Sequence, residues 1–97
     1  MERKDVAAAR LFYEAAANMG SGEAMVAVGT TYDPTILEQL AVKGFRADPV
    51  KAAEWYLKAR QANPLESGQR LEGLKAWLSA SATLGDLEAN TLRQLLR

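Results

Sequence analysis

The chain carries the stretch Asp48-Pro-Val-Lys-Ala-Ala-Glu-Trp-Tyr-Leu-Lys-Ala59, and about 43 residues earlier it carries Asp5-Val-Ala-Ala-Ala-Arg-Leu-Phe-Tyr-Glu-Ala-Ala16. Acidic, small and aromatic residues recur in the same order in the two copies. The aligned pairs are Asp5 and Asp48, Ala9 and Ala52, Phe12 and Trp55, Tyr13 and Tyr56, and Ala16 and Ala59. Duplication of a helix inside one chain is typical of helical repeat architectures. The two copies therefore predict a stack of similar helices.

The rest of the chain is divided into helical segments by glycine, proline, asparagine and aspartate. No segment alternates polar and apolar residues with the period of a β-strand. Cap-plus-proline pairs open three helices, at Asp33-Pro34, Asp48-Pro49 and Asn63-Pro64. We predict an all-α fold of five to six helices. The expected segments are 5–19, 23–32, 35–42, 49–62, 64–84 and a final helix after residue 86.

Local signals refine these boundaries. Asp5 is expected to cap the first helix, and Gly20 to end it in the left-handed conformation. Glu66 is suited to a partial capping box at the start of the helix from Pro64. Gly29 lies inside a helix, where glycine costs about 1 kcal/mol relative to alanine. We therefore expect a neighbouring helix to approach closely at Gly29.

Composition excludes several classes of function. Twelve basic residues balance twelve acidic ones, so no footprint for nucleic acid or anionic lipid is visible. The chain has no cysteine and no histidine, which excludes thiolate zinc sites, Ser-His-Asp triads and histidine acid–base chemistry within it. Its apolar runs are too short for direct membrane insertion. We expect no catalytic residue, no cofactor and no metal site, and the sequence leaves the cellular location open.

The pattern resembles that of a known family. Phe12-Tyr13, Ala16-Ala17, Gly20 and Ala24 are followed by Val28-Gly29 and Tyr32, and then by Gly44, Asp48, Lys51-Ala52, Trp55-Tyr56 and Lys58-Ala59. This order is similar to that of the Sel1-like repeats, relatives of the tetratricopeptide repeat. The resemblance implies a short right-handed α-solenoid of antiparallel helix pairs. It also implies a non-enzymatic module for protein–protein interaction or scaffolding, with a protein or peptide as partner.

The resemblance covers residues 5–62 of what we expect to be a single domain, 1–97. Residues 33–42 form an insertion relative to the usual compact loop, and residues 63–97 are expected to be degenerate C-terminal capping helices, because the end of a solenoid must meet water. The first copy corresponds to the second helix of a repeat. We therefore expect the chain to be the terminal part of a longer protein.

Most conspicuous residues have a structural explanation. The five aromatic residues Phe12, Tyr13, Trp55, Tyr56 and Trp77 are expected in the core, as aromatic residues at helical spacing usually are. In the first helix, the apolar positions are expected to form one buried stripe. They are Val6, Ala9, Leu11, Phe12, Ala16 and Met19. The carboxylates are explained by capping and by solvent exposure.

Two surfaces remain as candidates for binding. Insertions in helical repeats lie on one face and often carry function, so Gln39, Lys43 and Arg46 at the rim of the insertion are candidate partner-binding residues. The alternative is that the insertion's Leu37, Leu40 and Phe45 only cap the core. The second surface comprises the first helices of the units, 23–32 and the start of the helix from Pro64.

Two other functions stay open. The first is self-association into a homodimer through exposed apolar helix ends. The second is a small-ligand-binding or enzymatic domain, which requires an accessible pocket where two carboxylates converge. We expect no such pocket.

Overall fold

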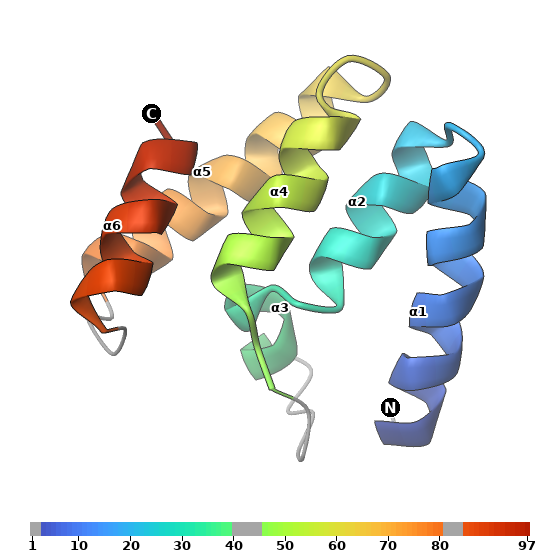
Figure 1. The fold of residues 1–97 in the computed structure, drawn as a ribbon, viewed down its shortest axis with the longest axis horizontal. Coiled ribbons are helices and arrows are strands. Elements are labelled where there is room, and N and C mark those ends of the chain that lie inside the picture. Colours follow the sequence, from blue (N-terminus) through green and yellow to red (C-terminus); the bar gives the residue numbers. More distant parts are fainter. Residues whose placement is uncertain (1–2, 40–45, 81–84) are drawn as a thin grey trace.

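The computed structural model describes residues 3–39, 46–80 and 85–97, and within these ranges it contains six helices and no strand (Figure 1). The helices are α1 (Arg3–Asn18), α2 (Gly22–Thr30), α3 (Pro34–Gln39), α4 (Pro49–Ala59), α5 (Pro64–Ala80) and α6 (Asp86–Leu95). The all-α class and the expected number of helices are confirmed.

The cap-plus-proline pairs begin helices as predicted. The Asp48 carboxylate accepts a hydrogen bond from the Lys51 backbone N–H at 3.0 Å, and Pro49 is the first residue of α4. Pro34 and Pro64 are likewise the first residues of α3 and α5. Gly20 has a φ of +97°, a conformation that residues with a Cβ rarely adopt. It ends α1 in the predicted way.

Three boundaries differ from the prediction. Asp5 lies inside α1, which begins at Arg3, so Asp5 is not its N-cap. The ends of α2 and α4 fall two and three residues earlier than expected, at Thr30 and Ala59, and turns follow both. The predicted continuations of α3 and α5 past Gln39 and Ala80 lie outside the described residues. Helix ends are where sequence patterns are least exact, because terminal turns lack part of their hydrogen bonding.

The central helix of the fold is α4, which packs against α2, α5 and α6. On the far side of α2 lies α1, so that α1, α2 and α4 follow one another across the molecule (Figure 1). The main core gathers around α4. It comprises Val26, Ala52, Ala53, Tyr56, Ala59, Leu71, Leu74, Leu92 and Leu96. A smaller cluster of Ala17, Ala24 and Val28 joins α1 to α2.

The α2–α4 contact is fixed by one side chain. Tyr56 is fully buried, and its hydroxyl donates a hydrogen bond of 2.6 Å to Asp33 Oδ2 just after α2. A Cβ placed on Gly29 would clash with Tyr56 Cε1 and Cδ1, because it would lie closer to them than real Cβ atoms approach their neighbours. The predicted close approach at Gly29 is therefore confirmed, and its partner is the ring of Tyr56.

Asp33 is buried although it is a carboxylate. Besides the Tyr56 hydroxyl, it accepts bonds from the Thr35 backbone N–H at 2.8 Å and the Thr35 hydroxyl at 2.7 Å. Burial, followed by the negative charge of Asp33 and the hydrogen bond to it, raises the pKa of Tyr56 far above its usual value. The tyrosine therefore stays protonated and keeps donating to Asp33.

A second polar contact docks α1. The Arg10 guanidinium donates to the Thr31 hydroxyl at 2.8 Å and to the Thr31 carbonyl oxygen at 2.7 Å, just beyond the end of α2. It also lies over the Tyr32 ring, 3.8 Å from the centroid. A cation at the C-terminal end of a helix is favoured by the helix dipole. Arg10 thus holds α1 against the end of α2.

The prediction that the apolar stripe of the first helix is buried is wrong for its largest members. Leu11 and Phe12 are each 72% exposed and Met19 is 89% exposed. Tyr13, which was expected in the core with the other aromatic residues, is 38% exposed. The prediction of a core role fits Tyr56, which is fully buried, and Trp55 and Trp77, which are half-buried against the two clusters. Phe12 and Tyr13 differ because α1 packs mainly on α2, which covers only one side of it.

Candidate functional site

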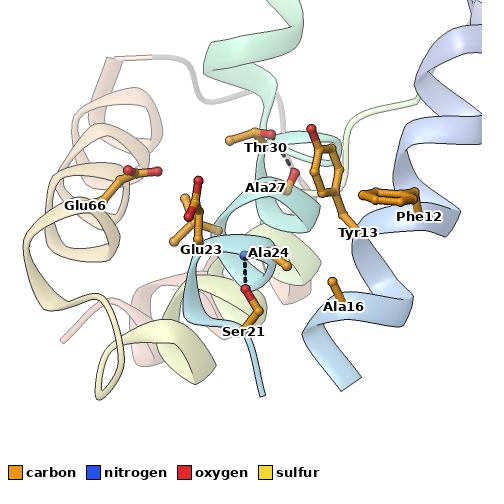
Figure 2. Close-up of a pocket in the computed structure, with 10 residues that line it drawn as sticks. Phe12, Tyr13, Ala16, Ser21, Glu23, Ala24, Ala27, Thr30 and Glu66 are labelled. Atoms are coloured by element: carbon orange, nitrogen blue, oxygen red, sulfur yellow. Dashed lines mark hydrogen bonds between the residues drawn. The ribbon is translucent and has the colours of Figure 1, made fainter. Parts of the chain in front are cut away.

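A hollow of about 420 Å³ lies over α2, between the middle of α1 and the first turn of α5 (Figure 2). We call it the α1–α2 hollow. This volume is within the range of about 300–1,000 Å³ typical of ligand pockets. Ten residues line it: Phe12, Tyr13, Ala16, Ser21, Glu23, Ala24, Val26, Ala27, Thr30 and Glu66.

The wall on the α1 side is aromatic. The rings of Phe12 and Tyr13 meet edge to face, with centroids 5.7 Å apart and planes at 77°. Figure 2 shows both side chains on the side of the hollow formed by α1. Exposed, rigid aromatic side chains offer a large contact area at a small cost in conformational entropy. This wall is suited to covering an apolar group of a partner.

The floor, formed by α2, is mostly apolar. Its alanine and valine side chains are small, and its two hydroxyl groups are used in local bonds. Ser21 Oγ accepts a hydrogen bond from the Ala24 backbone N–H at 3.1 Å, and Thr30 Oγ1 donates to the Ala27 carbonyl oxygen at 2.6 Å. Neither hydroxyl is thereby set up as a nucleophile, because neither has a basic partner.

The remaining side is acidic, which bears on an expectation from the sequence. We expected no accessible pocket where two carboxylates converge, and the α1–α2 hollow has two glutamates, Glu23 and Glu66, in its lining. Their carboxylates lie on the side away from the aromatic rings (Figure 2). No lysine or arginine is among the lining residues that the structure describes.

The role of Glu66 is a second correction. Its carboxylate lines the hollow and, among the described residues, makes no capping hydrogen bond at the start of α5. The sequence contained a signal for its true position, because Glu23 and Glu66 are separated by the same 43 residues as the two copies of the repeated helix. The duplication therefore places both glutamates at equivalent positions.

The hollow coincides with one of the two surfaces expected from the sequence, since it is built on α2 and the start of α5. The insertion is elsewhere. Gln39 is exposed at the end of α3, and Arg46 is exposed before α4. Neither lines the hollow, and Lys43 lies outside the described residues. A binding role for these three residues stays a prediction.

The alternative explanation of the insertion, in which it caps the core, fits Leu37. This side chain is 6% exposed, so it is a buried part of the fold. Leu40 and Phe45, the other two residues of that explanation, lie outside the described residues.

A second hollow, of about 600 Å³, lies between α5 and α6. Lys75 and Arg93 line it, but each is exposed and bonded within its own helix. Lys75 pairs with Glu72 at 3.4 Å, and Arg93 donates to Asn90 at 2.9 Å. This hollow therefore has charge but no preorganised, buried binding group.

Among the described residues, no three His, Cys, Asp or Glu side chains gather closely enough to hold a metal ion. In the same part of the chain, no helix has the length and apolar character needed to cross a membrane. No protein-family model matches the chain, and neither a curated protein nor a solved structure matches it significantly.

Proposed function

We propose that this protein is a non-enzymatic protein–protein interaction module that binds a segment of its partner in the α1–α2 hollow. The observation that carries the proposal is the exposed aromatic pair Phe12 and Tyr13 beside an apolar floor. Large exposed apolar side chains grouped at a concave site are characteristic of binding surfaces. The acidic side gives the site a preference for positive charge.

The finer architecture in this proposal is that of Sel1-like repeats, a right-handed solenoid of antiparallel helix pairs. Two features support it. The sequence of α4 repeats that of α1, and α4 lies between two other helices, α2 and α5, as a helix in a stack does.

A non-enzymatic role is favoured by the chemistry of the hollow. The chain has no histidine or cysteine, and both hydroxyl groups in the floor are bonded to the backbone. The two carboxylates remain as the groups best able to take part in proton transfer. Glu23 is exposed to water, which suits it to binding a cation through charge.

The proposal is tested by selecting peptides from a displayed random library on the folded protein. Selected peptides are then measured against the double variant Phe12→Ser, Tyr13→Ser. Because both rings are exposed, the variant should fold, and circular dichroism checks this. We expect binding to weaken at least tenfold, since the aromatic wall is lost.

The matched control is Leu87→Ser. Leu87 is 83% exposed on α6, away from the hollow, so its loss should leave peptide binding unchanged. A selection that yields no peptides, or only peptides that bind the double variant as tightly as the wild type, would contradict a binding role of the hollow.

A further inference from the structure

The two copies of the repeated helix carry the same pattern but differ in burial. On α4, the aligned residues Ala52, Tyr56 and Ala59 are all fully buried. On α1, Ala9 and Ala16 are half-buried and Tyr13 is exposed. Residues spaced by four and three positions share one face of a helix. The same face is therefore covered on α4 and open on α1.

The structure shows what covers this face on α4. The covering element is α2 with the residues that follow it, and three of its positions contact Tyr56 or belong to its cluster. Val26 is in the cluster with Ala52, Tyr56 and Ala59; Gly29 lies directly against the Tyr56 ring; and Asp33 accepts the Tyr56 hydroxyl. Val26 and Gly29 share one face of α2, and Asp33 follows in the turn after α2 ends at Thr30, so the covering surface is a helix face together with the turn beyond it.

The open face of α1 borders the one that docks on α2. Ala17 packs with Ala24 and Val28 of α2, Ala16 lies at the edge of this cluster, and Arg10 bonds to Thr31. Positions 10 and 17 lie about a quarter of a turn from positions 9, 13 and 16 at 3.6 residues per turn. A second helix can therefore approach the open face of α1 while α2 stays in place.

We infer that the partner of the α1–α2 hollow is an amphipathic α-helix that packs on the Ala9, Tyr13 and Ala16 face of α1. Its contacting face carries an apolar residue and a glycine three positions later, and an aspartate follows four positions after the glycine, just past the end of the helix, as Val26, Gly29 and Asp33 do. This inference rests on the proposed function and names the partner class.

The charge of the hollow adds one requirement. Glu23 and Glu66, which the duplication aligns, line the hollow together. We place the partner helix beside α2 in the way that α2 lies beside α5. The partner residue that aligns with Glu23 then comes near Glu23 itself. A lysine at that position, three residues before the apolar one, meets an acidic side chain, whereas a glutamate is repelled. The preferred helix face therefore carries a basic residue, an apolar residue three positions later and a glycine three positions after that, with an acidic residue just past the end of the helix.

The chain itself provides the probe. An acetylated and amidated peptide with the sequence of residues 21–37 contains the covering face of α2. Because short helices are marginal in water, a hydrocarbon staple joins positions 24 and 28, which lie off the contacting face. The affinity for the full protein is measured by fluorescence anisotropy of a labelled peptide. We expect saturable binding that weakens at least tenfold in the Tyr13→Ala protein.

Two peptide variants test the geometry. Gly29→Leu puts a side chain where the Tyr13 ring must lie, so it should weaken binding at least tenfold. Glu23→Lys should tighten binding several-fold. This gain should disappear in a protein with Glu23→Gln, because the added lysine then lacks its acidic partner.

The results separate this inference from the proposed function. If the stapled peptides fail to bind, or if Gly29→Leu binds as well as its parent, the helix inference is overturned. Library peptides that still depend on Phe12 and Tyr13 would then leave the proposed function standing. Concentration-dependent dimerisation in sedimentation, abolished by Tyr13→Ala, would identify a second copy as the occupant and would also overturn the inference.

Discussion

At the scale of single residues, the contact between Gly29 and Tyr56 shows how a cost in one helix is offset by packing with another. Glycine weakens α2, but it lets the Tyr56 ring approach the backbone closely and reach Asp33. Asp33 in turn precedes the first residue of α3 and accepts a hydrogen bond from the Thr35 backbone N–H. One tyrosine on α4 thus fixes the end of α2 and the start of α3.

Gly29→Ala should destabilise the protein by about 1–3 kcal/mol, because overpacking against Tyr56 outweighs the gain in helix propensity. Gly68→Ala is the matched control. Gly68 is also inside a helix, but beyond its chain neighbours and the adjacent helix backbone no atom of the described residues lies within 4 Å of its Cβ position, so the change should stabilise by about 0.5–1 kcal/mol. Urea unfolding measures both. Equal effects of the same sign would refute the close-packing explanation.

Tyr56 should make stability fall at high pH. Its pKa is raised in the folded protein, first by burial and then by Asp33, whereas the unfolded chain loses this proton near pH 10. Below pH 10 both states hold the proton and the contribution is complete. Above it, unfolding releases a proton, so the free energy of unfolding should drop by about 1.4 kcal/mol per pH unit.

The comparison with Tyr56→Phe isolates this effect, because lysines titrate in both proteins. We expect the stability difference between wild type and variant to shrink as the pH rises from 9 to 11, measured by thermal or urea unfolding. A difference that stays constant over this range would show that Tyr56 does not retain its proton.

At the scale of elements, prediction from sequence did best at helix ends set by local residues and worst for the burial of side chains, which needs a neighbour. Asp48, Pro49 and Gly20 act on their own backbone, so their patterns were sufficient to place helix ends. The apolar stripe of α1 was also real as a pattern. Burial, however, depends on a partner, and α2 covers only one side of α1. Leu11 and Met19 are therefore exposed.

The site could also be predicted only in part, because some of its residues depend on which neighbour covers them. Repeat geometry indicated α2 and the start of α5 as a surface, and the hollow lies there. The contribution of Phe12 and Tyr13 was missed, because aromatic residues at helical spacing were expected in a core. The direction of Glu66 was missed because a first-turn glutamate has a sufficient local explanation as a cap.

Arg10→Ala should loosen α1. Its guanidinium makes two hydrogen bonds to Thr31 and contacts Tyr32, and hydrogen bonds to charged groups contribute about 1.5–3 kcal/mol. We expect a loss of about 1–3 kcal/mol in urea unfolding followed by circular dichroism. Arg93→Ala on α6, whose guanidinium bonds to exposed Asn90, should cost less than about 0.5 kcal/mol. Similar losses would show that Arg10 has no special docking role.

At the scale of the whole molecule, packing is uneven. Helix α4 is in contact with three helices and supplies four of the nine residues of the main core: Ala52, Ala53, Tyr56 and Ala59. Helix α1 is at one side of the molecule and is joined to the rest mainly through the small cluster around Ala17 and through Arg10. The protein thus has a well-packed centre, and α1 lies at its edge with α2 as its main neighbour.

The position of α1 at the edge of the molecule links occupancy of the hollow to the local opening of this helix. A helix held by one neighbour opens locally at a small free energy, so its amide protons should exchange with solvent sooner than those of α4. The hollow takes one wall from α1 and its floor from α2, so it is complete only while α1 is docked. An occupant that binds both helices therefore slows the opening of α1. Binding would then change how long α1 stays docked on α2, while the fold keeps the same shape.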